Sequence, residues 1–363
     1  LETSQWFIRV LDARDELLAA GRRIDWRPEY MRTRYEHWVA NLQWDWCISR
    51  QRYYGVPFPL WHCNACGNVI LADEAQLPVD PAVDAPPHTC TCGSSDLRPE
   101  LDVMDTWATS SCTPLIALLR AGALDGQQET EQPIAEQIAR VGQQRLPMQL
   151  RPQAHDIIRT WAFYTIVKTY FHFGAIPWET AAISGHALAP DGTSIHKSLG
   201  NSPIAPQALI ERYGADAVRY WVCNSGLGSD QSVNEDDMRQ GTRLCAKLWN
   251  AARFIAGHLA AEGGLERWRL DDRQLGAPES LAHLAPTDRA LLSWLHHTIE
   301  TCTAHFKRYE YALALQTAER FFWTTLCDNY LEWAKARLYD GDPHEQEAAR
   351  TTLAIALAAT LKL

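Results

Sequence analysis

Four of the ten cysteines are clustered, and their spacing could hold a metal ion. Cys63 and Cys66 are separated by two residues, Cys90 and Cys92 by one, and the two pairs flank a loop of about 25 residues. Four thiolates suit tetrahedral zinc, and a zinc ion with four protein ligands is structural because no position is left for a substrate. The pattern therefore predicts a zinc-ribbon-like segment with Cys63, Cys66, Cys90 and Cys92 as ligands.

The second cysteine pair is one residue shorter than the usual spacing, which leaves alternatives open. The site must be distorted, or His88 must replace one thiolate, with His62 as a weaker substitute. Cysteines that remain in a degenerate ribbon without zinc would give the same sequence pattern. Glycines after Cys66 and after Cys92 favour an intact site, because they allow the tight turns that bring backbone amides to the sulfurs.

A second polar group lies in the loop from Asp191 to Asn201, which includes Lys197 and Ser198. The loop follows an apolar run that predicts a buried strand and precedes a helical pattern. Sheets of α/β proteins bind ligands beyond the carboxyl ends of their strands. A lysine there can neutralise charge that builds on a phosphate leaving group. Taken alone, however, a solvated surface loop explains this pattern better.

The elements that must position these groups alternate between strands and helices from about residue 101 to 185. Met148–Arg151 and Ala181–Ser184 have the composition of strands, and Asp156–His172 that of a helix. Helical patterns also cover Asp12–Ala20 and the stretch through Trp38. Such alternation is typical of a parallel α/β sheet.

The last third of the chain has the periodicity of an α-helical bundle. Helices are predicted from Pro206 to Cys223, from Asn234 to Ile255, and in two further segments that follow Pro286. Residues 257–286 are rich in glycine, proline and mixed charge and predict a long surface connection. The apolar positions expected to face the core of the bundle are Leu244, Leu248, Ala251, Ile255, Leu291, Leu295, Ile299, Cys302, Phe306, Tyr311, Leu315, Ala318 and Phe322.

The totals describe an ordinary soluble protein of 363 residues with a formal net charge of −10. No run approaches the roughly 18–20 apolar residues that span a bilayer, so we expect no membrane partner. No secretory signal is present, and the cysteines therefore indicate a reducing, cytoplasmic location. The chain begins without Met at Leu1 and stops within a helical pattern, so we expect a fragment of a longer protein.

The loop containing Lys197 resembles the second signature of the class I aminoacyl-tRNA synthetases for valine, isoleucine and leucine. That signature is Lys-Met-Ser-Lys-Ser followed by Gly-Asn. Lys197 and Ser198 match it, whereas Ser194 replaces the first lysine, Ile195 the methionine and His196 the serine. The resemblance implies that Lys197 and Ser198 are catalytic and that Lys197 binds ATP, supplied with Mg. It also indicates that the loop is damaged.

Other stretches extend the resemblance over almost the whole chain. Trp46–Gly55 is similar to the segment that returns from the editing insertion to the catalytic domain. Asp102–Ser111 is similar to an Asp-Thr-Trp element beside the amino-acid pocket. Arg151–Trp161 is similar to a segment that contacts adenosine and the amino acid. The residues implied for the sites are Gln153 and Asp156 at the ATP ribose, and Trp107, Ile157 and Trp161 in the amino-acid pocket. Without the resemblance, ordinary core and helix–sheet packing would explain the pocket residues.

Pro152–Asp156, Phe321–Trp323 and Cys327–Glu332 are most similar to the valine branch. The implied function is ATP-dependent activation of valine and its transfer to tRNA(Val). The implied partner of the chain is a missing N-terminal half, which would carry the first half of the nucleotide fold. The editing pocket would lie upstream of Leu1, so we expect no proofreading.

The tRNA would meet the C-terminal part of the chain. Tyr213–Trp221 is similar to a helix that contacts the inside of the tRNA L, and the helices from about Met238 resemble an anticodon-binding bundle. For any one basic side chain there, a solvated helix face explains the charge better than a phosphate contact. The candidate phosphate contacts are Arg243, Lys247, Lys307, Arg308, Lys335 and Arg337.

The predicted fold class is α/β: the second half of a Rossmann-like nucleotide-binding domain with a zinc-ribbon-like insertion, followed by an α-helical bundle. In the expected domain boundaries, residues 1–60 return from the editing insertion, 61–100 form the zinc-ribbon-like segment, and 101–185 form the second half of the catalytic domain. Residues 186–237 form the signature loop and stem-contact region, and 238–363 form the anticodon-binding bundle. One alternative is a non-catalytic tRNA-binding paralog or pseudoenzyme with a degenerate loop. Another is a generic zinc scaffold, which would leave the order of the family segments unexplained.

Overall fold

The computed structural model describes residues 3–124, 133–195, 200, 205–260 and 283–363. The chain divides into two compact units, Leu1–Ile183 and Ser184–Leu363. Each unit has its own hydrophobic core. They are therefore described separately.

The first unit is built on a three-stranded sheet with the order β2-β10-β9. Its strands are β2 (Asp25–Arg27), β9 (Met148–Ala154) and β10 (Trp178–Ser184). β2 and β10 are parallel, with Trp26 opposite Ala181. Four consecutive residues of β10, from Thr180 to Ile183, are buried, as expected for a strand covered on both faces.

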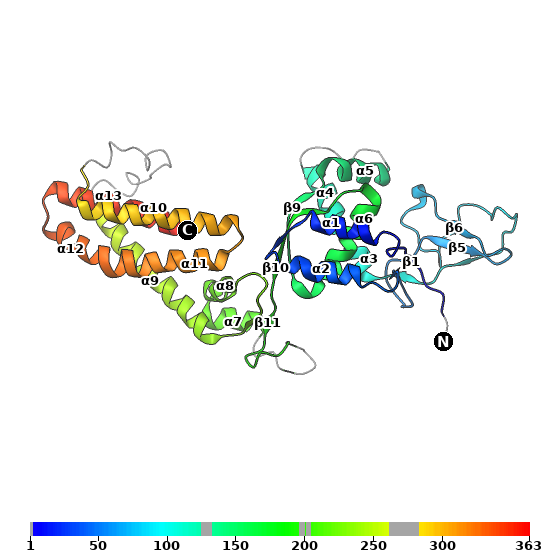
Figure 1. Ribbon diagram of the computed structural model, residues 1–363, viewed down its shortest axis with the longest axis horizontal. Coiled ribbons are helices and arrows are strands. Elements are labelled where there is room, and N and C mark those ends of the chain that lie inside the picture. The colour runs from blue at the N-terminus through cyan, green and yellow to red at the C-terminus, as the bar shows by residue number, and fades with distance from the viewer. Residues whose placement is uncertain (1–2, 125–132, 196–199, 201–204, 261–282) are drawn as a thin grey trace. The chain divides into compact units, whose positions relative to one another are not determined.

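Three helices pack with this sheet in one core: α1 (Arg14–Arg22), α2 (Met31–Ala40) and α6 (Trp161–Phe173). Tyr35 of α2 is fully buried, and its hydroxyl donates to the carbonyl of Leu17 in α1 at 2.8 Å. Phe163 of α6 lies against the Tyr35 ring. The core thus joins segments from both ends of the first unit, as Figure 1 shows by colour.

Shorter elements complete the first unit. β1 (Phe7–Ile8) pairs antiparallel with β3 (Trp46–Cys47), and β4 (Ser49–Arg50) with β8 (Val103–Met104). The remaining helices are α3 (Thr106–Ser110), α4 (Thr113–Leu124), α5 (Ile134–Arg145) and the 3-10 turn η2 (His155–Ile158).

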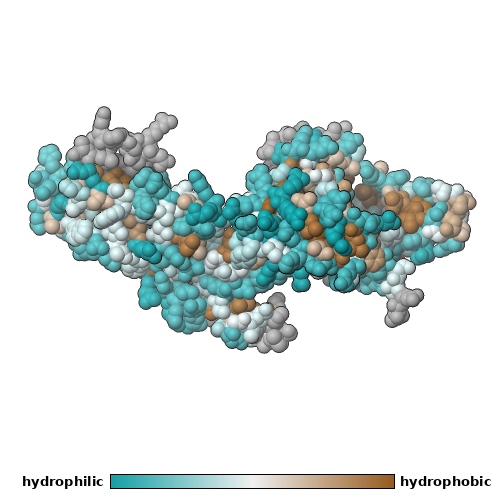
Figure 2. Space-filling view, viewed as in Figure 1, coloured by the Kyte–Doolittle hydropathy of each residue, from teal (hydrophilic) through white to brown (hydrophobic). Residues whose placement is uncertain are grey.

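A small antiparallel sheet carries the cysteines. Its order is β6-β5-β7, with β5 (Leu60–Cys63), β6 (Val69–Leu71) and β7 (Leu97–Pro99); η1 (Glu74–Gln76) follows β6. Figure 2 shows apolar surface over this segment, and the side chains of Val69 and Leu71 are exposed.

The second unit begins with a short parallel pair, β11 (Ala187–Leu188) and β12 (Gln231–Ser232). The other elements are α7 (Pro206–Tyr213), α8 (Ala215–Cys223), α9 (Glu235–Ala260), α10 (Pro286–Lys307), α11 (Tyr311–Arg320), the π-helix η7 (Phe321–Tyr330), α12 (Leu331–Asp340) and α13 (Pro343–Lys362). Helices α9, α10, α12 and α13, with η7, share one core.

The predicted α/β fold with a helical C-terminal region is confirmed, with local corrections. The single helix expected from Pro206 to Cys223 is interrupted at Gly214, whose φ of 88° is left-handed. The helix expected from Asp156 is a 3-10 turn before α6 begins at Trp161. Four positions expected in the core of the bundle lie outside it. Phe306 is exposed, and three residues of α11 are only partly buried, because this helix buries Ala312 and Ala314 instead. Those three residues are Tyr311, Leu315 and Ala318.

The connection predicted over 257–286 starts later than expected, because α9 runs to Ala260; most of its residues lie outside those described. Among the described helices, none combines the length and the apolar character needed to cross a bilayer.

Candidate functional site

The four clustered cysteines meet in the small sheet. Their sulfur atoms all lie within 4.8 Å of one another. The Sγ atoms of Cys63 and Cys92 are 3.6 Å apart, and those of Cys66 and Cys90 are 3.5 Å apart. The short second pair therefore contributes both of its cysteines to one cluster.

The turns around the cluster have the predicted geometry. Gly67 has a φ of 76° and Gly93 a φ of 89°, both in the left-handed region that glycine reaches without strain. A hydrogen bond from the backbone N–H of Cys92 is the largest influence on Cys90, and it holds the pKa of that thiol near 6. The backbone amide of Cys92 thus favours the thiolate form of Cys90, which is the form that binds metal.

The two histidines considered as substitute ligands have other contacts. The Nδ1 atom of His88 lies 2.8 Å from the carbonyl oxygen of Thr89, and the Nε2 atom of His62 lies 3.0 Å from Glu100. Trp6 donates to the same carboxylate at 2.8 Å. Burial opposes ionisation of Glu100, but hydrogen bonds from the backbone of Asp102, His62 and Trp6 hold its pKa near 2. This network ties the sheet to the N-terminal segment.

Four sulfurs at these separations fit a tetrahedral zinc ion, because they form a complete thiolate donor set without a histidine. Such an ion would cross-link the loop and supply no catalytic chemistry. The cluster is therefore a candidate structural metal site.

A second group of predicted residues gathers where β9 ends and α6 begins. Gln153 lies at the end of β9, Asp156 and Ile157 in η2, and Trp161 at the first position of α6. The Trp161 indole N–H donates to the carbonyl of Ser110, the last residue of α3, at 3.1 Å. Trp107 is in that same short helix, so its segment is joined to Trp161 by a direct contact.

Gln153 and Asp156 differ in their surroundings. Gln153 is buried, and its Oε1 atom has no hydrogen-bond partner. Asp156 is exposed in η2, two residues after β9 ends. An amide oxygen and a carboxylate are both acceptors that suit the hydroxyl donors of a ligand.

Arg151 changes the expected amino-acid pocket. Its guanidinium carbon lies 3.1 Å from the centroid of the Trp161 ring and 5.5 Å from that of Trp178. Burial lowers the pKa of Arg151 to about 10, and its Nε and Nη2 atoms have no acceptor. One face of the Trp161 indole is thus covered by a cation, which the sequence pattern did not predict.

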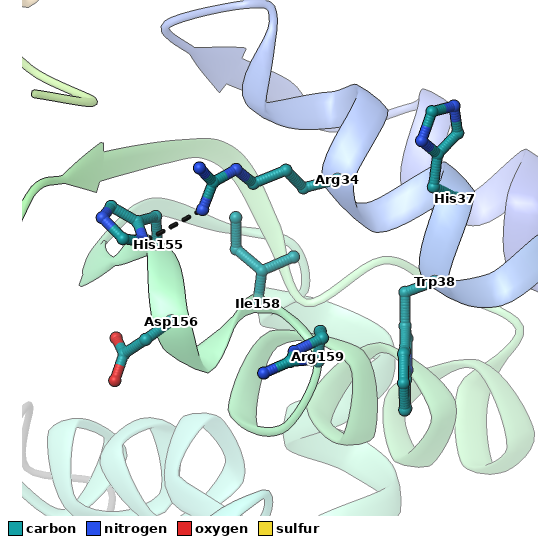
Figure 3. Close-up of a pocket in the computed structure, with 7 residues that line it drawn as sticks. All are labelled: Arg34, His37, Trp38, His155, Asp156, Ile158 and Arg159. Carbon is teal, nitrogen blue, oxygen red and sulfur yellow. Dashed lines mark hydrogen bonds between the residues drawn. The ribbon is translucent and has the colours of Figure 1, made fainter.

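Asp156 also lines a cleft of about 590 Å³ whose other residues the sequence did not single out. Figure 3 shows this cleft between α2 and the start of α6, with Arg34 reaching toward His155. The lining residues are Arg34, His37, Trp38, His155, Asp156, Ile158 and Arg159. A signal was available, because Arg34, His37 and Trp38 are spaced to share one helix face.

The signature loop is described from Asp191 to Ile195 and at Gly200. Thr193 donates from its backbone and its hydroxyl to Asp191, at 3.0 and 2.7 Å, and these bonds lower the pKa of that carboxyl. Gly192 has a φ of 81°, which completes the turn. Lys197 and Ser198, the predicted catalytic residues, lie outside the described residues.

The candidate phosphate contacts of the bundle are mostly ion-paired. The structure corrects the prediction for Arg337 as a phosphate contact. Its guanidinium makes two hydrogen bonds, at 2.9 and 2.6 Å, to the fully buried Asp288 inside the unit. The other pairs are Lys247 with Asp328, Arg308 with Glu310, and Lys335 with Glu332.

The comparisons with known proteins agree with this arrangement. The family model of class I tRNA synthetases (I, L, M and V) matches residues 1–234, and that of the anticodon-binding domain of tRNA ligase matches residues 288–363. The chain therefore belongs to the class I tRNA synthetase family.

Within that family the chain is similar to valine–tRNA ligases. It is 42% identical to that of Anaplasma marginale (strain St. Maries) over 97% of this chain and 40% of the relative. It is 40% identical to the valine–tRNA ligase of Rickettsia prowazekii (strain Madrid E) over 100% of this chain and 43% of the relative. The chain thus spans about two fifths of the length of these relatives.

Solved structures show the same fold. A Mycobacterium tuberculosis methionyl-tRNA synthetase bound by methionyl-adenylate has a TM-score of 0.66 at 20% identity, covering 99% of this chain and 60% of that one. The LeuRS of Agrobacterium radiobacter K84 agnB2, in a ternary complex with tRNA and LeuAMS, has a TM-score of 0.61 at 20% identity. The match covers 86% of this chain and 38% of that one.

Proposed function

We propose that this chain forms part of a valine–tRNA ligase and supplies the second half of its catalytic domain and part of its anticodon-binding domain. The observation that carries this proposal is the identity of about 40% to valine–tRNA ligases along the whole chain. The geometry supports it, since four of the residues expected at ATP and valine lie around the end of β9, and one of them, Trp161, donates to Ser110 in the helix that carries Trp107. The four residues are Gln153, Asp156, Ile157 and Trp161. The domain boundaries given above, including 186–237 for the stem-contact region, are part of the proposal.

In this proposal, ATP binds with Mg at the carboxyl end of the sheet. Gln153 and Asp156 accept hydrogen bonds from the ribose hydroxyls, and Lys197 and Ser198 stabilise the departing pyrophosphate. Activation joins the carboxylate of the amino acid to the α-phosphate of ATP as pyrophosphate leaves. Holding these two groups in one orientation lowers a large part of the activation barrier. The missing N-terminal half would supply the rest of the nucleotide site.

Trp107, Ile157 and Trp161 would form the apolar wall of the valine pocket. Because Arg151 covers one face of the Trp161 ring, valine would use the other face or the indole edge. A pocket of this kind cannot strongly reject threonine, which has nearly the same shape. Discrimination against threonine would therefore need a site other than this pocket.

The cysteine cluster would hold one structural zinc ion, and the bundle would bind the anticodon arm of tRNA(Val). The zinc proposal rests on the four convergent sulfurs.

The test is pyrophosphate exchange. The isolated chain is expected to show none with valine. Grafted in place of the matching segment of the Anaplasma marginale enzyme, it should support exchange with valine in preference to isoleucine. Asp156→Ala in the graft should reduce that exchange by about 10²-fold or more. Exchange that prefers another amino acid would refute the valine assignment.

The alternative function is a tRNA-binding module without catalysis, and the altered residues Ser194 and His196 favour it. Ser194→Lys with His196→Ser in the graft separates the two. A large gain in exchange indicates a slow but genuine synthetase, whereas no change in an inactive graft indicates a non-catalytic module.

A further inference from the structure

Cys112 and Lys168 form a pair of chemically reactive side chains that takes no part in the proposed activation of valine. Cys112 lies between α3 and α4, and Lys168 lies on α6. The Lys168 ammonium donates to the Sγ atom of Cys112 at 3.2 Å. Both residues are only partly buried, so a small solute can reach the sulfur and the nitrogen.

The other described cysteines lack this combination of groups. Cys47 lies beside a guanidinium instead, with the Nη1 atom of Arg50 at 3.7 Å from its sulfur. Cys302 and Cys327 are buried, and four more cysteines form the candidate zinc site. Within the described part of the chain, Cys112 is thus the one accessible thiol with a lysine amine in hydrogen-bond contact.

This contact favours oxidation of the sulfur by a peroxide. An ammonium group stabilises a neighbouring thiolate, which is the form that attacks hydrogen peroxide. The thiolate of Cys112 bonds to one peroxide oxygen as the O–O bond breaks, which leaves a sulfenic acid. The departing hydroxide takes a proton from the Lys168 ammonium and becomes water, so the sulfur is oxidised by two electrons and the lysine is left as a neutral amine.

The neutral amine can then react with the oxidised sulfur. Its nitrogen attacks the sulfenic sulfur, an S–N bond forms, and the hydroxyl leaves with one amine proton as water. Backbone nitrogens trap sulfenic acids as sulfenamides in the same way. An amine already in contact with the sulfur has a high effective concentration for this step. Two equivalents of an added thiol reverse it, because they restore the cysteine and the lysine and form a disulfide between themselves.

We propose that Cys112 and Lys168 are a redox modification site at which hydrogen peroxide forms a reversible sulfenamide cross-link. The link joins the end of α3 to α6, which are already connected by the hydrogen bond from Trp161 to Ser110. These helices carry Trp107 and Trp161, so oxidation locks together two walls of the expected valine pocket. That consequence rests on the proposed function, whereas the cross-link itself does not.

The test is peptide mapping of the 363-residue chain after treatment with hydrogen peroxide. Chymotrypsin releases Ala108–Leu115, in which Cys112 is the one cysteine, and Thr165–Tyr170, which contains Lys168 and no cysteine. We expect the two peptides to be joined, with a mass about 2 Da below their sum because two hydrogens are lost. Dithiothreitol should separate them. A disulfide cannot give this product, because the second peptide has no sulfur.

Lys168→Arg is the matched variant, because it keeps a positive charge beside Cys112 but replaces the amine with a guanidinium that stays protonated. We expect no joined peptides. The sulfenic acid of Cys112 should instead persist, so that its labelling by dimedone rises by about tenfold over the wild type. Cys47 is the internal control, since its neighbour Arg50 is unchanged and its labelling should be equal in both proteins. Melting curves verify that both proteins are folded.

The inference is overturned if the folded wild type yields the two peptides separately, with Cys112 unchanged or about 32 Da heavier as the sulfinic acid. Equal dimedone labelling of Cys112 in the wild type and in Lys168→Arg also overturns it. So does an equal yield of joined peptides from the urea-unfolded chain, because the fold would then not be what places the amine. None of these readouts needs valine, ATP or tRNA, so failure of valine-dependent exchange in the graft would refute the proposed function and leave this result intact.

Discussion

The buried ion pair of the second unit allows a quantitative prediction. Asp288 is fully buried and accepts hydrogen bonds from Tyr330, from the backbone N–H of Ala285, and from two nitrogens of Arg337. Burial opposes the charge on Asp288, but the hydrogen bonds of Arg337 and Tyr330 hold its pKa below the usual range. The carboxylate therefore depends on Arg337 for most of its compensation.

Arg337→Met removes the cation and keeps much of the side-chain volume. We expect a loss of about 3–5 kcal/mol in the free energy of unfolding, because an uncompensated charge stays buried. Asp288→Asn in the same background should recover a large part of this loss, since the amide still accepts from Tyr330 without a charge. Urea unfolding followed by far-UV circular dichroism measures each variant.

The matched control is Lys335→Met on the same helix. Lys335 pairs with Glu332 at the surface, where both side chains are substantially exposed, so its loss should change stability by about 0.5 kcal/mol or less. The reasoning is wrong if Arg337→Met lowers the free energy of unfolding no more than Lys335→Met does. It is also wrong if the losses caused by Arg337→Met and by Asp288→Asn alone simply add up in the variant that carries both.

Three further outcomes follow from the first unit. Purified chain should contain about one zinc ion by elemental mass spectrometry, and Cys90→Ser should remove it while Cys47→Ser does not. The fold lowers the pKa of Glu100 from 4.5 to about 2, so the ionised carboxylate stabilises the folded chain fully above pH 4.5. This contribution is lost as the pH falls toward 2. Glu100→Gln should therefore flatten this part of a curve of stability against pH, followed by tryptophan fluorescence. Arg151→Met should keep the stability within about 1 kcal/mol or raise it, because two guanidinium nitrogens lack acceptors; a thermal-melt loss well above that would show that stacking on Trp161 outweighs the desolvation cost.

The regular elements were predictable where periodicity and burial agree. The apolar run Ala181–Ser184 is part of β10, and Ala251 and Ile255 face the core of the bundle as their spacing indicated. The cysteine cluster was also predictable, because four ligands within one short segment need no knowledge of the rest of the fold.

Contacts between distant segments were not predictable. Arg34 and Arg159 line one cleft only because α2 packs beside η2, and no local pattern relates them. In the same way, Arg337 has the pattern of a surface cation on α12 until the start of α10 brings Asp288 against it. Arg151 was expected at the end of a strand and the start of the Arg151–Trp161 segment, and its contact with the Trp161 ring emerges only from the folded structure.

The catalytic claim is tested most directly by transfer of labelled valine to tRNA(Val) by the grafted enzyme, in which this chain replaces the matching segment of the Anaplasma marginale relative. The account predicts that the graft charges valine, that it charges isoleucine far less, and that Asp156→Ala reduces charging by about 10²-fold or more without changing the melting temperature. A graft that folds and binds tRNA but charges no valine, or one in which Asp156→Ala has no effect, would contradict it.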